Sequence, residues 1–241
     1  IIDADSIGAS TGDDALDIAV TSLTIAGAGD TVAVSGDSYI EEADGLTITS
    51  TVTDGGISIT STAGDVILTS MATSDDSVSV TATDGTLTVA TVAAGTGNVT
   101  LEATAGSIRD GADGTPIIGG LVTLTAQDGI GTTGDIETSA DQLDVSVTGT
   151  GIIDLDETDG VELLDIDTVD GSITIVTNGD TVATDVTSTA DDDADPITIT
   201  VTTGDLEVGT INAGATAGDV VLTAGQNVTD GDGNSLITAD D

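Results

Sequence analysis

The side chains that could do chemistry in this chain are almost all carboxylates. The 241 residues include 44 Asp and Glu, one Lys or Arg in total, no His and no Cys. Acyl-transfer and thiol catalysis are excluded, because both need side chains that are missing. Thiolate metal sites are excluded on the same ground. What remains is carboxylate catalysis, or the binding of hard cations such as Ca²⁺, which prefer oxygen ligands.

Acidic and amide side chains gather in three loops that are candidates for Ca²⁺. The segment DGDGN at 230–234 places oxygen ligands at alternate positions, although Ser235 stands where an EF-hand loop has Gly. A looser acidic loop lies at the corresponding place in the first half, and an acidic run precedes Pro196. The alternative is a solvated acidic surface with Asp turns. The predicted metal ligands are Asp230, Asp232, Asn234, Asp110, Asp113, Asp191 and Asp193.

Carboxylate catalysis is the weaker hypothesis. Asp154, Asp156 and Glu157 lie close together in sequence, and paired acids cleave glycosidic bonds in many enzymes. Sugar sites usually add aromatic platforms and basic groups, but this chain has one Tyr and one Arg. We therefore predict that the protein is not an enzyme. Acidic residues that alternate with apolar ones are expected to line one outer face: Asp154, Asp156, Glu162, Asp165 and Asp167.

The net charge limits the partners. A formal charge of -43 excludes a phosphate-binding surface, so nucleic acid is not an expected partner. No apolar run approaches the roughly 18 residues that a membrane span needs, so membrane insertion is not expected. The charge implies divalent cations or a salty medium that screens the self-repulsion. The 38% of apolar residues nevertheless indicates a folded chain rather than a disordered one.

Short apolar–polar–apolar triplets recur along the chain and predict half-buried strands. Examples are Leu87-Thr88-Val89 and Val99-Thr100-Leu101, whose apolar members should point inward. Asp-Gly or Gly-Asp pairs separate the triplets and favour turns. Phe and Trp are absent and Tyr39 is the one aromatic residue, so any core is thin and aliphatic.

The strand starts follow a regular rhythm. They fall at residues 57, 66, 78, 87 and 99, in steps of 9 and 12, so that every second strand recurs after 21 residues. A strand-and-turn repeat of this length is typical of a solenoid. The sequence therefore predicts an all-β parallel solenoid of about 21 residues per coil. The alternative is a pair of tandem Ig-like β-sandwiches, but the spacing is very regular and a Trp core is missing.

A longer repeat is superimposed on this rhythm. The segment from Thr202 resembles the segment from Thr83, and Leu206 corresponds to Leu87 at an offset of 119. We divide the chain into solenoid modules at 1–117 and 118–235. Residues 236–241 then begin a further repeat or form a head-to-tail joint. The ends support this interpretation, because Ile2–Gly8 resembles Leu124–Gly131.

The segments GDVILTS, GNVTLEATAGSI and GDVVLTAGQNV resemble the repeat regions of large secreted bacterial adhesins of the filamentous-haemagglutinin-like kind. The resemblance implies a right-handed β-helix, which also agrees with the general preference for right-handed crossovers. It further implies an extracellular or cell-surface location and a structural fibre or stalk that associates with itself. The alternative function is an adhesin module that binds a surface receptor or matrix through a Ca²⁺-dependent acidic face.

Overall fold

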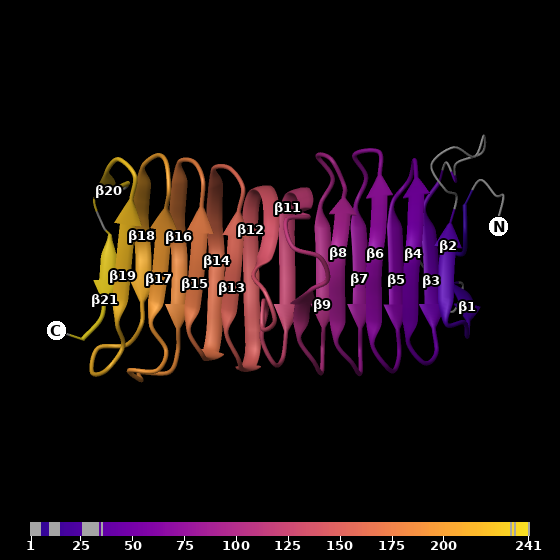
Figure 1. The fold of residues 1–241 in the computed structure, drawn as a ribbon, viewed down its shortest axis with the longest axis horizontal. Coiled ribbons are helices and arrows are strands. Elements are labelled where there is room, and N and C mark those ends of the chain that lie inside the picture. Colours follow the sequence, from indigo (N-terminus) through magenta and orange to yellow (C-terminus); the bar gives the residue numbers. More distant parts are fainter. Residues whose placement is uncertain are drawn as a thin grey trace.

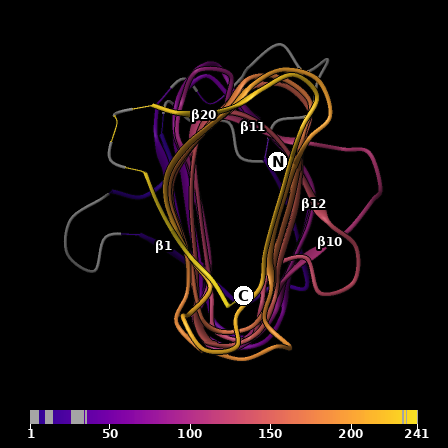
Figure 2. The same ribbon diagram turned by 90° about the vertical axis from the view of Figure 1, so that its left-hand side faces the viewer.

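The computed structural model describes residues 6–9, 15–25, 34, 36–231, 233 and 235–240. The chain forms a rod with the two termini at opposite ends (Figure 1). Seen along the rod, successive turns of the chain overlie one another and trace one elongated ring (Figure 2). All regular structure in the described residues is strand, and no helix able to cross a membrane is found among them.

The described residues form 21 strands. In the first half they are β1 Leu16–Ile18, β2 Ser22–Ile25, β3 Ser38–Glu42, β4 Leu46–Thr53, β5 Ile57–Ser61, β6 Val66–Thr73, β7 Val78–Ala82, β8 Leu87–Ala93, β9 Val99–Ala103, β10 Ile108–Asp110 and β11 Ile117–Ala126. In the second half they are β12 Ile136–Thr150, β13 Ile153–Glu157, β14 Val161–Asp170, β15 Ile173–Thr177, β16 Thr181–Ser188, β17 Ile197–Val201, β18 Leu206–Asn212, β19 Val220–Ala224, β20 Val228–Asp230 and β21 Leu236–Thr238.

Every ladder between these strands is parallel. Strands inside the rod pair with the strand one coil earlier and one coil later, for example β7 with β5 and with β9. The structure is thus a β-solenoid of about ten coils of about 21 residues, which confirms the predicted fold class. Tandem Ig-like sandwiches are excluded, because their sheets are antiparallel.

The core consists of aliphatic side chains stacked in register between coils. Ile57 pairs with Val78, Val78 with Val99, and Val99 with Val122, and all four side chains are buried. The predicted inward residues Leu87, Val89, Val99 and Leu101 are buried as well. Aliphatic stacking of this kind fills a narrow cross-section without aromatic residues, because each side chain packs on a similar one about 4.8 Å away.

Glycines at the corners allow neighbouring coils to approach closely. A Cβ added at Gly85 would clash with the backbone carbonyl of Gly64, and one added at Gly106 would clash with that of Gly85. These three glycines lie 21 residues apart, on top of one another at the same corner. The Asp-Gly and Gly-Asp pairs of the sequence therefore mark corners where backbone packs directly on backbone.

The second half of the chain repeats the first half after a half-turn about the rod axis. In sequence, β7 corresponds to β17 at the 119-residue offset. In the structure, β7 is connected through β9, β11, β12, β14 and β16 to β18. By contrast, β17 belongs to the ladder of β13, β15 and β19, on the other long side. The offset is therefore a whole number of coils plus half a coil.

The half-turn coincides with irregular coils in the middle of the rod. Residues 111–116 form a loop between β10 and β11, and loops near β10 and β12 project from the ring (Figure 2). β11 pairs with β8 through its first residues and with β9 through its last, so it runs around a corner. β12 does the same between β13 and β14. The division into modules at residue 117 stays a prediction from sequence.

Truncation of a stacked core side chain tests this description. Leu101→Ala removes a fully buried side chain between two coils, and we expect a loss of about 2–5 kcal/mol in the free energy of unfolding. The matched control is Thr100→Ala, which changes the exposed neighbour on the same strand. Urea unfolding followed by circular dichroism measures both variants. Equal midpoints for the two would contradict the inward ladder.

Candidate functional site

Asp side chains at the corners act as connectors between coils. Each accepts a hydrogen bond from a backbone N–H about one coil later in the sequence. Asp65 Oδ1 accepts from Thr86 N at 2.8 Å, and Asp75 Oδ1 accepts from Thr96 N at 3.0 Å. The same contact is made by Asp37 to Gly56 N, Asp180 to Asp205 N, Asp191 to Thr216 N and Asp205 to Asn227 N. Many corner carboxylates therefore have a structural partner.

Asp191, a predicted metal ligand, is the most fully engaged of these connectors. Its Oδ1 accepts from the N–H groups of Thr216 at 3.0 Å and Ala217 at 2.7 Å, and its Oδ2 accepts from the Thr216 hydroxyl at 2.5 Å. The hydroxyl of Thr216, followed by these N–H groups, lowers the pKa of the Asp191 carboxyl. Asp193 lies exposed in the same loop.

The first-half candidate loop holds Asp110 and Asp113. Asp110 Oδ1 accepts from Ala112 N at 2.9 Å, which closes a local turn. Asp113 is exposed in the loop between β10 and β11. A second carboxylate reaches this loop, because Glu137 Oε1 accepts from the N–H of Gly114. The geometry of Asp110 is that of a turn-forming Asp.

The second-half candidate loop begins at Asp230. Its Oδ1 accepts from Gly233 N at 2.7 Å and from the Ser235 hydroxyl at 2.7 Å. Asp232 and Asn234 lie outside the described residues. Among the residues that the structure describes, no group of three or more acidic side chains is placed to hold a metal ion. Calcium binding at these loops stays a prediction.

A pair of glutamates is buried at equivalent corners, a feature that the sequence analysis missed although it named Glu157. Glu42 and Glu157 are both inaccessible to solvent. Each is the last residue of a five-residue strand and is followed by x-Asp-Gly: Glu42-Ala43-Asp44-Gly45 and Glu157-Thr158-Asp159-Gly160. The recurrence of this short pattern after 115 residues is the feature of the sequence that could have identified the two corners as equivalent.

Glu42 is surrounded by backbone donors. Its Oε2 accepts from Asp44 N at 2.8 Å and Gly45 N at 2.7 Å, and its Oε1 accepts from Val20 N at 3.1 Å. Burial raises the pKa of Glu42, but the backbone N–H groups of Asp44, Gly45, Val20 and Ala43 outweigh it and lower the pKa overall. Glu42 is thus held as a carboxylate that closes the corner.

Glu157 has weaker donors and an acidic neighbour. Its Oε2 accepts from the Thr138 hydroxyl at 2.7 Å and from Ala140 N at 3.2 Å, and its Oε1 accepts from Asp159 N at 3.2 Å. Burial raises the pKa of Glu157 to about 7, and the nearby Asp159 carboxylate adds to the rise. The hydrogen bonds from Thr138 and Asp159 N offset part of it.

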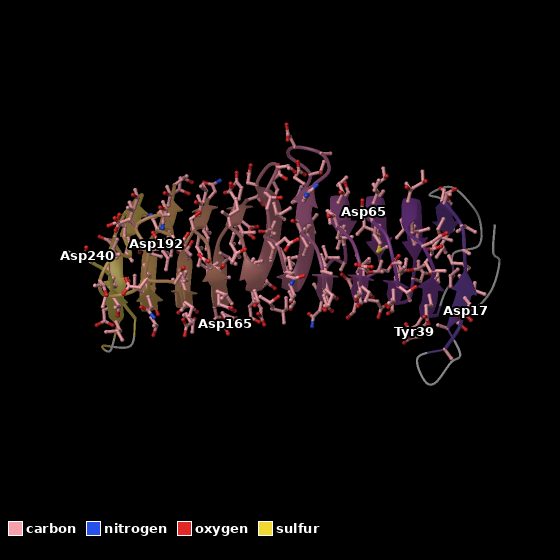
Figure 3. The ribbon with its side chains drawn as sticks, turned by 90° about the horizontal axis from the view of Figure 1, so that it is seen from below. Asp17, Tyr39, Asp65, Asp165, Asp192 and Asp240 are labelled. Carbon is pink, nitrogen blue, oxygen red and sulfur yellow. The ribbon has the colours of Figure 1, made fainter. Side chains whose placement is uncertain are left out.

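Carboxylates also stack on the outer face of β12, β14 and β16. Asp144 pairs with Asp165 on the next coil, and Asp185 follows one coil further. Burial and then the charges of Asp185 and Asp144 raise the pKa of Asp165. Burial and the same stack raise the pKa of Asp167, although its hydrogen bond from Ser146 opposes this. Figure 3 shows oxygen-tipped side chains along both long sides of the rod.

The expectation of one acidic face is wrong for Asp154, Asp156, Glu162, Asp165 and Asp167. Asp154 and Asp156 lie on β13, in the ladder of β15 and β17, whereas the other three lie on β14, in the ladder of β16. The chain turns a corner between these two strands, so local alternation places each set on its own side. Burial and then Asp135 raise the pKa values of Asp154 and Asp156, and Asp156 adds to the rise at Asp154.

A carboxyl pair closes the acidic loop before β17. Asp195 is 8% exposed and hydrogen-bonds the side chain of Asp170. Burial, then Asp170, then the charge of Asp192 raise the pKa of Asp195. Two carboxyl groups in contact share a proton more readily than they both ionise. This contact joins the end of β14 to the loop that leads into β17.

Searches of protein-family models, curated proteins and solved structures return no match for this chain. The assignment of the β-solenoid fold therefore comes from the structure itself. The structure is compatible with β-helix repeats, and the resemblance to adhesin repeats remains one of sequence pattern.

The buried Glu157 predicts a specific pH dependence of stability. A carboxyl whose folded-state pKa is raised stabilises the fold at low pH, and this contribution is lost as pH rises through about 7. Glu157→Gln should therefore stabilise the protein relative to wild type at about pH 8 by up to roughly 3 kcal/mol, and much less at about pH 5.

Urea unfolding at both pH values measures this difference. The matched control is Glu41→Gln, which removes one charge at an exposed position beside the equivalent Glu42. A Glu157→Gln effect that is the same at both pH values would show that Glu157 ionises normally in the folded protein.

Proposed function

We propose that this chain is a subunit of an extracellular structural fibre or stalk, built from stacked β-solenoid coils. It assembles head to tail or forms part of a longer array of such coils. The observation that supports this proposal is the continuity of the inter-coil ladders. They run from β1 and β2 to β19, β20 and β21, and every one is parallel.

The construction suits a load-bearing element. Hydrogen bonds between coils are directed along the rod, so an axial pull is shared by all strands of a coil at once. The aliphatic ladders add packing between the same coils. Within the described residues, strands and tight corners account for most of the chain, and the loops are short.

The acidic surface suits a solvated rod outside cells. A net charge of -43 keeps separate rods apart at low salt and excludes phosphate-rich partners. An extracellular or cell-surface location is supported by the resemblance to secreted adhesin repeats. Catalysis has no part in this proposal, because the carboxylates of the described corners mostly bind backbone N–H groups.

Electron microscopy of the native material that carries this chain tests the proposal. We expect smooth fibres of constant width whose axial repeat equals one or two modules. A module of five to six coils is about 25 Å long at the inter-strand spacing of about 4.8 Å. Isolated particles with beaded outlines would contradict the proposal.

A second candidate function is an adhesin module that binds a receptor or matrix through Ca²⁺. The observation that favours it is the carboxylate stack of Asp144, Asp165, Asp167 and Asp185, where burial and then mutual repulsion raise the pKa values of Asp165 and Asp167. Such a surface gains from a neutralising cation.

Titration calorimetry with Ca²⁺ against a chelator-treated sample tests this alternative. We expect saturable heat and a rise in melting temperature if the acidic faces or loops bind Ca²⁺ specifically. The control is Asp165→Asn with Asp185→Asn, which should reduce the heat if the stack is the site. Absence of both heat and melting shift would exclude a Ca²⁺-dependent face.

A further inference from the structure

The last coil of the described chain leaves core positions uncovered. Val228 is 51% exposed and Ile237 is 49% exposed, whereas their partners one coil earlier, Leu206 and Ile211, are fully buried. Leu236 on the same coil is 58% exposed. Among the described residues, the strands β19, β20 and β21 thus present an edge of exposed aliphatic side chains at one end of the solenoid. Such an edge is a template for another coil.

This last coil has a counterpart inside the rod. β20 pairs with the first residues of β18, just as β10 pairs with the first residues of β8. β21 pairs with the last residues of β18, just as the start of β11 pairs with the last residues of β8. Val228 therefore corresponds to Ile108, and Ile237 corresponds to Ile117. Inside the rod the next coil covers these positions. Ile130 pairs with Ile108, and β12 pairs with the start of β11.

The first described coil of the chain is a counterpart of that covering coil. Ile7 bridges to Ser38, at the start of β3, as Ile130 bridges to Ile153, at the start of β13. Gly8 and Gly131, the next residues, both have positive φ, at 65° and 75°. β1 pairs with β3 as the start of β12 pairs with β13.

Two finer details make the correspondence specific. The β2–β4 ladder shifts register between Leu23 and Thr24, and the β12–β14 ladder shifts between the equivalent Leu143 and Asp144. Val20 N donates to the buried Glu42, and the equivalent Ala140 N donates to the buried Glu157. The first coil therefore has the backbone shape of the coil that covers β10 and the start of β11.

We propose that the first coil of a second copy of this chain docks on the last coil of the first copy, in the register of this internal junction. The proposal rests on the fibre proposed above and specifies its joint. Ile7 of the second copy lies on Val228, and Ile18 lies on Ile237. Thr238 and Ala19 then lie side by side, as Ile118 and Ser139 do at the internal junction.

The joint keeps the ladder of β14, β16 and β18 continuous. β20 and β21 continue the ladders of β14, β16 and β18, which trace back to β3 and β1. Each module is rotated by half a turn about the rod axis relative to the module before it, so two modules together complete a full turn. A second copy therefore adds in the same orientation as the first. The net charge of -43 opposes the approach, so the joint forms best where salt screens the repulsion.

Cysteine cross-linking tests the register, because the chain has no Cys of its own. Thr238→Cys combined with Ala19→Cys places two thiols on directly paired residues, within the Cα distance that a disulfide needs. Thr238→Cys with Asp17→Cys is the matched control. Asp17 lies two residues before Ala19 in the chain, which gives a diagonal separation from Thr238 of about 8 Å, too far for a disulfide.

We expect the Thr238→Cys, Ala19→Cys variant to form a ladder of dimers, trimers and longer species on mild oxidation in about 0.5 M NaCl. The control variant should remain at most dimeric. A bond within one chain is excluded, because the two ends lie roughly 45 Å apart over about ten coils. Circular dichroism checks that both variants keep the strand content of the wild type.

Sedimentation velocity separates this inference from the proposed function. We expect wild-type rods to become longer as the protein concentration rises. Ile237→Asp should shorten the rods. The control Ile67→Asp adds a charge at an exposed position on the side of the rod and should leave rod length unchanged. If the rods lengthen but both cysteine pairs cross-link equally, the proposed register is wrong and the proposed fibre is not contradicted. Rods that stay the same length at all concentrations would contradict the docking of a second copy. Electron microscopy of the native material would then remain the test of the proposed fibre.

Discussion

The parallel register between coils is the constraint on which the rest of this structure depends. Because each coil pairs residue by residue with the next, every side chain stacks on the side chain about 21 residues away. One aliphatic ladder runs unbroken through nine positions: Leu46, Val66, Leu87, Ile108, Ile130, Ile153, Ile173, Ile197 and Val220. Such a stack favours side chains that pack on copies of themselves. Val, Ile and Leu satisfy this requirement, which explains a core without Phe or Trp.

The same stacking is unfavourable for charge, and the structure limits the cost in two ways. Corner Asp residues accept N–H groups of the next coil instead of facing another carboxylate, as Asp65 does with Thr86. Buried Glu42 has enough backbone donors to stay ionised, whereas Glu157, beside Asp159, does not. Neither arrangement is made for Asp165 between Asp144 and Asp185, and there burial and then repulsion raise the pKa. The acidic coat is thus compatible with the fold mainly because much of it is hydrogen-bonded between coils.

Local pattern was sufficient to predict the solenoid, because strand alternation and the 21-residue rhythm are direct consequences of stacking. Leu87, Val89, Val99 and Leu101 point inward as their spacing indicates. Non-local contacts were beyond the sequence. Asp191 is a predicted metal ligand beside Asp193, and the sequence does not show that its carboxylate accepts hydrogen bonds from Thr216, 25 residues away. Glu157 looks like any charged residue at a strand end, although a corner buries it. Sequence similarity aligns β7 with β17 but does not by itself show that the two strands lie on opposite long sides.

The half-turn explains how two similar halves of one chain can differ electrostatically. Equivalent corners, such as those of Glu42 and Glu157, lie on opposite long sides and meet different neighbours in the adjoining coils. A strict whole-coil repeat would stack each half's acidic positions in a single line along one side of the rod. An offset of a half coil distributes them between two sides, which lowers the repulsion at any one line. The half-coil offset therefore keeps the coils in register and also distributes the acidic side chains over two sides of the rod.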